Sequence, residues 1–345
     1  MKLIAPQSFG KVAFGVALAI VIYFISGVTA DAAPDPKIIE AAKKEGKLVW
    51  YNSIIAPHAQ NILDEFIKKY PFIQATFWRA SGLKVYTKLS TESRANKFDW
   101  DVLSLSDAES ILLVKQQGFI TAYNSPERQA YNADVKDGEG YWTGFYALPT
   151  GLGFNTNLVS KDDVPKTYQD LLDPKWKDGK ISIDTEGEQL LIGLMDAWGK
   201  EKAIDYMKKL AMQKPAIGRG NSRRIQLAAA GEFPLVIAYT NTIQNLKVKG
   251  TPIDWVNLEP VVVKVDALTL GAKSAHPNAG RLLIDFILSV DGQTLIKNQN
   301  RAPLRNGIEA QPAKLNSGFK RVVLRPETSL NIKENSALYK QLLGF

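Results

Sequence analysis

Cysteine is absent from the 345-residue chain, and histidine is nearly absent, with only His58 and His276. Without cysteine the chain can form no disulfide, no Fe–S cluster, no thiolate zinc site and no thiol nucleophile. Two histidines also leave little room for a Ser–His–Asp triad or a multi-histidine metal site. These absences disfavour most classes of hydrolytic and redox enzyme before any motif is considered.

The remaining composition is typical of a soluble globular protein, with 45% hydrophobic and 23% charged residues. The net charge is +8, but basic and acidic residues alternate, as in 161–163 and 175–178. Nucleic-acid binding usually requires clustered Lys and Arg interleaved with aromatic residues. We therefore expect no nucleic-acid partner and instead a mild attraction for anionic ligands.

The first thirty residues have the layout of a secretory signal peptide. Lys2 and Lys11 precede the uncharged run 12–28, and small residues around Ala30 provide acceptable cleavage sites. The alternative is an uncleaved membrane anchor, because a run of about 17 residues is near the lower limit for spanning a bilayer. No cysteine follows the run, which excludes a lipid-anchored lipoprotein. We expect a signal peptide at 1–30 and a free protein in the periplasm.

Strand and helix patterns alternate in the region after the leader. The apolar runs 47–51, 73–78 and 100–105 are predicted strands. Apolar residues recur at helical spacing over 58–70 and 83–94, and Ser106-Asp107 can cap a third helix. Strand–helix alternation of this kind predicts a mostly parallel sheet with helical crossovers.

The segment 141–155 is apolar but contains Pro149, Gly151 and Gly153, which favours an extended crossing between lobes over a central strand. A second strand–helix series follows, and the extended run 258–270 is predicted to carry the chain back. Asn278 is the predicted N-cap of a helix over 279–289. The fold class predicted is α/β with two discontinuous lobes, lobe 1 comprising 31–148 plus 265–305 and lobe 2 comprising 149–264 plus 306–345.

Several segments in this order resemble the periplasmic solute-binding proteins of ABC importers, type II fold, in the branch that contains ferric-ion-binding proteins. The resemblance covers nearly all of the chain after the leader. It is carried by LVWYNS at 48–53, FIKKYPFIQATFWRASG at 66–82, WDVLSLSDAESI at 100–111, GLGFNTNLV at 151–159, VPKTYQDLLDPKWKDGKISI at 164–183, GNSRRIQLAAAGEFPLVIAYT at 220–240 and PNAGRLLIDFILSVDGQTLI at 277–296.

The resemblance implies a ligand held between two closing lobes and delivery of that ligand to a membrane permease. Loops at the carboxyl ends of the strands are where an open α/β sheet binds ligands, and helix N-termini there suit anionic oxygens. Arg79 would add a bidentate donor to such an anion. The predicted ligand-binding residues are Ser53, Arg79, Ser81, Ser106, Thr185, Glu186, Asn221, Ser222, Tyr239 and Asp266.

The same resemblance implies that a ferric site is incomplete in this chain. Ferric binders of the branch use a His after the first strand, a Glu after the third and a Tyr-Tyr pair, where this chain has Ile55, Ser106 and Tyr239-Thr240. Asn221 matches an Asn that helps those proteins hold the accompanying anion. We therefore expect no metal ligand and no cofactor, unless Asp184, Glu186 or Asp266 substitutes.

The leading interpretation is a monomeric, non-enzymatic receptor for a small anionic solute, with no catalytic residues. A ferric-ion-binding protein of an iron importer remains the first alternative. The second is an exported enzyme that acts on an anionic substrate, with Asp184 or Glu186 as acid and base. His58 is predicted in the first turn of a helix after Pro57, and His276 in a structural turn.

Overall fold

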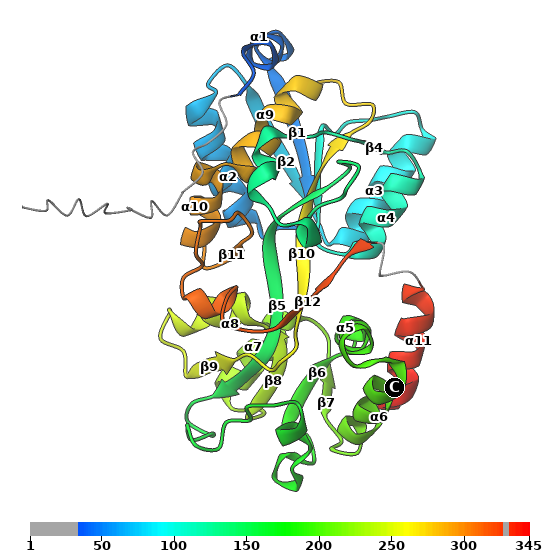
Figure 1. Ribbon diagram of the computed structural model, residues 1–345, viewed down its shortest axis with the longest axis vertical. Helices are drawn as coiled ribbons and strands as arrows, with labels where there is room; N and C mark the ends of the chain where they lie inside the picture. The colour runs from blue at the N-terminus through cyan, green and yellow to red at the C-terminus, as the bar shows by residue number, and fades with distance from the viewer. Residues whose placement is uncertain (1–33, 327–330) are drawn as a thin grey trace, which may run out of the picture.

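The computed structural model describes residues 34–326 and 331–345, so the predicted signal peptide lies outside the described residues. Two lobes are stacked along the long axis of the molecule (Figure 1). The long strands β5 (Thr143–Asn155) and β10 (Val261–Gly271) run between them. Within the two described ranges, no helix has the length and apolar character needed to cross a membrane.

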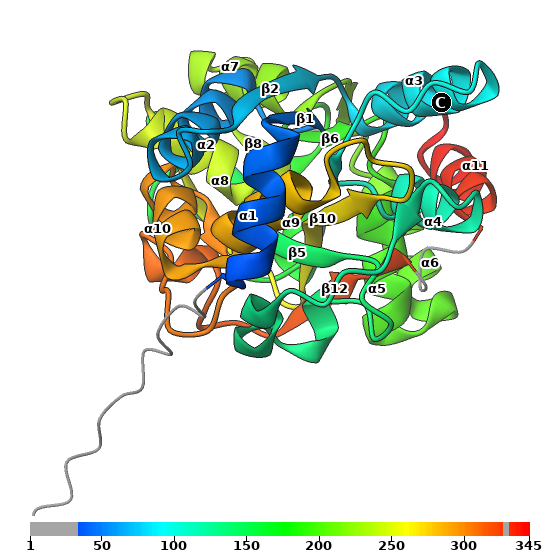
Figure 2. The same ribbon diagram turned by 90° about the horizontal axis from the view of Figure 1, so that it is seen from above.

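Lobe 1 is built on a sheet with the strand order β2-β1-β3-β10-β5. The strands β1, β2 and β3 are parallel, and β10 is antiparallel to both β3 and β5. Helices cover both faces of this sheet (Figure 2). The elements of the lobe are α1 (Pro36–Glu45), β1 (Lys47–Asn52), α2 (Ala56–Lys69), β2 (Gln74–Arg79), α3 (Gly82–Arg94), β3 (Val102–Leu105), α4 (Ala108–Gln116), β4 (Ile120–Thr121), α9 (Pro277–Leu288), α10 (Val290–Asn298) and β11 (Ala302–Pro303).

Lobe 2 continues the sheet in the order β5-β8-β6-β7, and β12 (Arg321–Leu324) pairs with β10 at the waist between the lobes. Its further elements are β6 (Ile181–Asp184), α5 (Glu188–Trp198), α6 (Lys200–Ala211), β7 (Ala216–Gly218), α7 (Asn221–Ala230), β8 (Leu235–Tyr239), α8 (Thr240–Lys247), β9 (Ile253–Val256) and α11 (Ile332–Leu343). Short 3-10 turns occupy Pro126–Ala130, Ala133–Val135, Gln169–Leu172, Pro174–Trp176 and Ala313–Leu315.

The segment 141–155 does cross between the lobes, but the prediction that it is not a central strand is wrong. As β5, it pairs with β10 up to Pro149 and with β8 from Thr150 onward. The proline therefore lies where the strand leaves one set of partners for the next. A Cβ on Gly151 would lie 2.5 Å from Cγ2 of Thr240, and one on Gly153 would lie 2.9 Å from Cδ1 of Ile243. The glycines let α8 pack directly on the strand.

The predicted N-cap of the helix after 277 is also wrong. The helix α9 begins at Pro277, and Asn278 lies inside its first turn. The Glu45 carboxylate, at the end of α1, accepts hydrogen bonds from the backbone N–H groups of Asn278 (3.0 Å) and Ala279 (2.8 Å). A carboxylate from another helix therefore satisfies the first N–H groups of α9 and complements its dipole.

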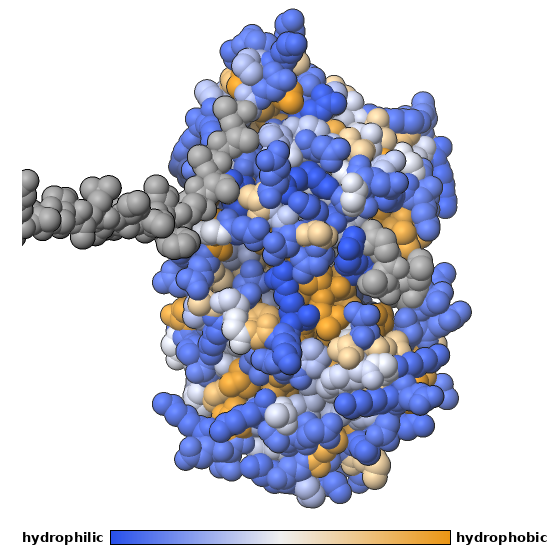
Figure 3. All heavy atoms as spheres, in the orientation of Figure 1, coloured by the Kyte–Doolittle hydropathy of each residue, from blue (hydrophilic) through white to orange (hydrophobic). Residues whose placement is uncertain are grey.

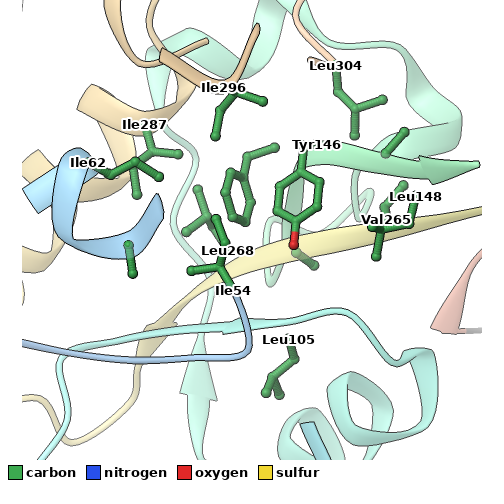
Figure 4. Close-up of a cluster of buried hydrophobic side chains, with 14 of the residues drawn as sticks. Ile54, Ile62, Leu105, Tyr146, Leu148, Val265, Leu268, Ile287, Ile296 and Leu304 are labelled. Atoms are coloured by element: carbon green, nitrogen blue, oxygen red, sulfur yellow. The ribbon is translucent and has the colours of Figure 1, made fainter. Parts of the chain in front are cut away.

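Two apolar clusters hold the lobes together. One fills lobe 1 and continues along β5 to α7 and α8, and the other lies under α5, α6 and α11. Figure 4 shows the first cluster where β5 and β10 cross it, with Tyr146 among Ile54, Leu268 and Leu304. The face drawn in Figure 3 is mostly hydrophilic, with scattered apolar areas that include one at the waist. The crossing strands β5 and β10 contribute buried residues to both clusters.

Candidate functional site

Three of the predicted ligand-binding residues meet where β1 and β3 end beside β10. Ser53 follows β1, Ser106 follows β3, and Asp266 lies within β10. The Ser53 hydroxyl oxygen is 3.2 Å from Oδ2 of Asp266 and 3.4 Å from the hydroxyl oxygen of Ser106. The parallel arrangement of β1 and β3 places their carboxyl ends at one edge, as the sequence predicts.

Asp266 is a fully buried carboxyl group with 0% exposure. Its Oδ2 accepts hydrogen bonds from the hydroxyl of Tyr146 (2.8 Å), directly opposite on β5, and from Ser53. Among the described residues, Oδ1 has no hydrogen-bond partner. Burial raises the pKa of Asp266 to about 6, although the two hydroxyl donors and the nearby charges of Arg301 and Lys264 oppose the rise.

A cation–aromatic contact involves Tyr146, the residue whose hydroxyl donates a hydrogen bond to Asp266. The Arg301 guanidinium lies 4.3 Å from the ring centroid of Tyr146. Its Nε donates a hydrogen bond of 2.9 Å to Nδ1 of His58, in the first turn of α2. Burial and the charge of Arg301 lower the pKa of His58 to about 4, so this imidazole is neutral at pH 7. His58 therefore accepts a structural hydrogen bond in this network.

The second histidine is part of a turn, as the sequence predicts. Nδ1 of His276 is 3.1 Å from Oδ2 of Asp101, and the hydroxyl of Ser274 donates to Oδ1 of the same carboxylate. The serine therefore bonds to the aspartate and the arrangement differs from a catalytic triad, in which the histidine takes the serine proton.

Lys264 lies two residues before Asp266 on β10, so both side chains are on the same face of the strand. Its ammonium nitrogen donates a hydrogen bond of 3.3 Å to the phenol oxygen of Tyr239, at the end of β8 in lobe 2. Burial opposes the charge on Lys264, but Tyr239 and the carboxylates of Asp107 and Glu188 outweigh it and raise its pKa. The Lys264 ammonium group thus lies between β10 and the end of β8, where the carboxylates of Asp107 and Glu188 also act on it.

In lobe 2, the end of β6 and the start of α7 form one polar network. Asp184 accepts a hydrogen bond from the buried Arg224 (3.0 Å), and the two groups form an ion pair. Nδ2 of Asn221 is 3.5 Å from Oδ2 of Asp184. Oδ1 of Asn221 accepts a hydrogen bond of 3.2 Å from the backbone N–H of Tyr239. Asn221 therefore fixes the turn that carries Tyr239 into the space between the lobes.

Two pockets lie next to the polar groups described above. The first, called here the hinge pocket, is a small space lined by Ser106, Gln189 and Lys264 together with the apolar residues Ala108, Ile111, Val265, Leu324 and Pro326. The second, called the lobe-2 pocket, is lined by residues in and around β6, α5, α7, β8 and α11, and its polar members include Asp184, Glu186, Gln189, Asn221, Tyr239 and Tyr339. Gln189 lines both pockets.

The remaining predicted site residues lie farther out. Arg79 is exposed at the end of β2, and its Nε donates to the carbonyl of Ile54 (3.1 Å). Ser81 precedes α3, and Ser222 is exposed in the first turn of α7. Glu186 forms an exposed ion pair with Arg219, and Thr185 precedes it in the loop after β6. Their roles as ligand contacts stay predictions.

Several residues at the site were missed by sequence reasoning, namely Tyr146, Gln189, Lys264 and Arg301. Asn52 is the last residue of β1 and directly precedes Ser53. It lies opposite both Arg79 and Ser104 in the sheet, is 0% exposed, and neither amide atom has a hydrogen-bond partner among the described residues. Lys264 carries the clearest signal in retrospect, because a lysine interrupts the apolar run Val261–Val265.

Apart from Tyr239, the positions expected to carry ferric ligands hold chemically unsuitable groups. Ile55 is 44% exposed at the start of α2, and the buried Thr240 donates its hydroxyl to the carbonyl of Pro149 (3.4 Å). In the described parts of the chain, no three His, Cys, Asp or Glu side chains gather where they could hold a metal ion. Tyr239 stands beside an ammonium group rather than a second tyrosine.

Two α/β lobes joined by crossing strands, with a small pocket where the lobes meet and a polar pocket in lobe 2, define a two-lobed binding protein of the type II periplasmic fold. The family comparison agrees with this architecture. The model for bacterial extracellular solute-binding proteins matches residues 100–323, and the chain belongs to that family.

The similar proteins include both iron binders and a sugar-phosphate binder. The Fe(3+)-binding periplasmic protein of Serratia marcescens is 20% identical over 283 residues, which cover 79% of this chain and 82% of the relative. The structure of iron-bound HitA from Pseudomonas aeruginosa matches with a TM-score of 0.73 at 22% sequence identity. The match covers 86% of this chain and 99% of HitA. The structure of AfuA from Actinobacillus pleuropneumoniae, with fructose-6-phosphate bound, matches with a TM-score of 0.67 at 22% sequence identity. The match covers 87% of this chain and 97% of AfuA.

Proposed function

We propose that this chain is an exported, non-catalytic receptor that captures a small anionic solute between its lobes and delivers it to an ABC importer permease. The observation that carries the proposal is the Lys264 ammonium group, 3.3 Å from the Tyr239 phenol. It provides a positive charge on a strand that both lobes share. Ser106 lines the same pocket from lobe 1, and Gln189 lines it from lobe 2.

The same ammonium group argues against iron as the solute. A ferric ion needs several anionic oxygen ligands, and Tyr239 is the one expected ligand that this chain retains. A lysine cation beside that phenol repels a trivalent ion at the position where it would bind. Iron-bound HitA and AfuA with fructose-6-phosphate both have this fold at 22% identity, so the fold itself is compatible with either ligand.

The enzyme alternative is disfavoured by the partners of its candidate acid and base. The Asp184 carboxylate forms an ion pair with the buried Arg224, and Glu186 forms one with Arg219 on the surface. General acid–base catalysis needs carboxyl groups that exchange protons with a substrate near neutral pH. Both carboxylates are instead bound by arginine side chains of their own lobe, which suits a fixed recognition surface better than proton transfer.

The test compares Lys264→Met with Lys320→Met, a control at an exposed lysine before β12. Isothermal titration calorimetry with inorganic phosphate, citrate, D-glucose 6-phosphate and ferric citrate identifies the anion that binds. Loss of a charged hydrogen bond, about 1.5–3 kcal/mol, predicts about 10- to 150-fold weaker binding in Lys264→Met. Lys320→Met should bind like the wild type.

Two results would contradict the proposal. The first is equal affinity of Lys264→Met and the wild type for the anion that binds. The second is binding of ferric iron alone, with a visible tyrosinate-to-iron band that disappears in Tyr239→Phe, while no iron-free anion binds.

A further inference from the structure

We infer that the helix α11 completes the solute site on lobe 2, and that Tyr339 is a positioning residue for the wall of the lobe-2 pocket. The inference rests on the proposed function, because it concerns a pocket in which the solute would be held. It is carried by the contacts of the buried Tyr339 phenol with the end of β6 and the loop 185–187, which line that pocket.

Tyr339 lies on the face of α11 that packs against lobe 2. The helix contacts α5 and α6, beside which it lies in Figure 1. Leu338, Tyr339 and Leu342 recur at helical spacing and share one face. The two leucines are partly buried against the apolar cluster under α5 and α6, and Tyr339 is 1% exposed within it. Apolar packing of the helix therefore carries one phenol group to the edge of the lobe-2 pocket.

The phenol oxygen of Tyr339 fits closely against the loop after β6. Its hydroxyl donates a hydrogen bond of 2.7 Å to the carbonyl of Asp184, the last residue of β6. A Cβ on Gly187 would lie 2.9 Å from Cζ of Tyr339 and would overlap the phenol oxygen. The φ of Gly187 is −98°, which residues other than glycine also adopt, so the backbone itself does not require a glycine here. The close approach of the phenol requires it.

A buried arginine holds Asp184 from its other side. The strands β6 and β8 pair as far as Ser182 and Val236, and the guanidinium of Arg224 bridges them where this pairing ends. It donates to the carbonyls of Ser182 (3.3 Å) and Ile237 (2.9 Å) and to the carboxylate of Asp184 (3.0 Å). The backbone of Asp184 is thus fixed from α11, and its side chain is fixed from α7.

These contacts fix groups that line the lobe-2 pocket. Asp184, Glu186 and Gly187 line it together with Tyr339. Oδ1 of Asp184 accepts a hydrogen bond of 3.0 Å from the backbone N–H of Glu186, so a displacement of Asp184 also displaces the loop. A site binds more tightly when its polar groups are held in position before the solute arrives. Loss of the Tyr339 hydroxyl should therefore weaken solute binding in a protein that still folds.

The test compares Tyr339→Phe with Tyr206→Phe in the full exported protein. Tyr206 is a matched control because it is a buried tyrosine of the same lobe, on α6, and its phenol oxygen has no hydrogen-bond partner within the described ranges. It packs against the rings of Tyr168 and Trp198 and is not among the residues that line the lobe-2 pocket.

The first readout needs no solute. Amide hydrogen exchange, followed residue by residue by NMR, reports how firmly the loop after β6 is held. We expect the amide of Glu186 to exchange about two- to tenfold faster in Tyr339→Phe than in the wild type, on the scale of one neutral hydrogen bond. The same amide should be unchanged in Tyr206→Phe.

The second readout is calorimetry with inorganic phosphate, citrate and D-glucose 6-phosphate. For the probe that binds the wild type most tightly, Tyr339→Phe should reduce the affinity about three- to tenfold, and Tyr206→Phe should not change it. Urea unfolding of both variants shows whether each is fully folded at the temperature of the titration.

A second variant approaches the same contact from the loop. Gly187→Ala adds the Cβ that would overlap the phenol oxygen, so it should also weaken binding of the probe. In the Tyr339→Phe background this overlap is smaller, and Gly187→Ala should cost less affinity there than in the wild type. An equal cost in both backgrounds would count against the contact between the phenol and the loop.

The inference is overturned if Tyr339→Phe binds the probe as tightly as the wild type, or if exchange at Glu186 is unchanged. A lower unfolding free energy with unchanged affinity and exchange would assign Tyr339 to stability alone. If Lys264→Met weakens binding and Tyr339→Phe does not, the inference fails while the proposed anion receptor stands. If no anion binds but exchange at Glu186 is faster in Tyr339→Phe, the proposed function fails while Tyr339 still holds the loop.

Discussion

Asp266 offers a direct test of how a buried carboxyl group is maintained between the lobes. The change is Asp266→Asn, which keeps oxygen and nitrogen atoms at the positions of the two carboxyl oxygens but removes the titrating proton. The amide oxygen can still accept from Tyr146 and Ser53, which lie 2.8 Å and 3.2 Å from Oδ2. The variant is therefore expected to fold with the same hydrogen bonds around this position.

The expected effect on stability follows from the pKa of Asp266. Burial raises it from an ordinary value near 3.8 to about 6, so the folded protein binds this proton more tightly than the unfolded chain does. The corresponding stabilisation is complete below the unfolded pKa and is lost as the pH rises through about 6. A difference of about two units between the folded and the unfolded pKa corresponds to about 3 kcal/mol in the free energy of unfolding. About half of this stabilisation is gained as the pH falls from 7.5 to 5.

The assay is urea unfolding of the wild type and Asp266→Asn at several values between pH 7.5 and pH 5. We expect the wild type to gain about 1.4 kcal/mol relative to the variant as the pH falls across this window. Asp285, whose pKa burial also raises to about 6, is present in both proteins and cancels in the comparison. A difference in unfolding free energy that is constant with pH would refute the reasoning.

Two further predictions concern a helix start and the leader. Glu45→Ala removes the acceptor for the N–H groups of Asn278 and Ala279, so urea unfolding should show a loss of about 1–2 kcal/mol. Glu40→Ala, at an exposed position on α1, is the control, and an equal loss in both variants would count against a capping role. We also expect N-terminal sequencing of the exported protein to begin just after Ala30 because small residues mark the cleavage site; retention of the initiator methionine would contradict this.

The alternating elements of both lobes were predictable because their patterns are local. The strand predicted at 47–51 is β1, and the helix predicted at 83–94 is α3, with bounds that differ by one residue. The segment 141–155 was harder because proline and glycine normally interrupt a central strand. Here the packing of α8 requires the glycines, and a change of strand partners accommodates the proline. Both reasons depend on tertiary contacts, which a local sequence pattern does not reveal.

The site was partly predictable for the same reason. Ser53 and Ser106 come directly after strands, and parallel strands bring such positions to one edge. Arg79 follows a strand as well, yet β2 is the outermost strand of its sheet, and the guanidinium bonds to the carbonyl of Ile54. Position along the chain therefore identified the edge of the sheet. It could not say which residues on that edge lie nearest the other lobe.

Lys264 and Asp266 show what a different use of the sequence would have found. They interrupt the apolar run from Val261 to Leu270, and their spacing of two places both on one face of a strand. A charged residue inside a buried strand is costly unless a partner compensates it, and two on one face require a polar environment along that face. Because β10 joins the two lobes, the space between the lobes provides this polar environment. The charges within the crossing strand therefore locate the floor of the site more directly than the loops around it do.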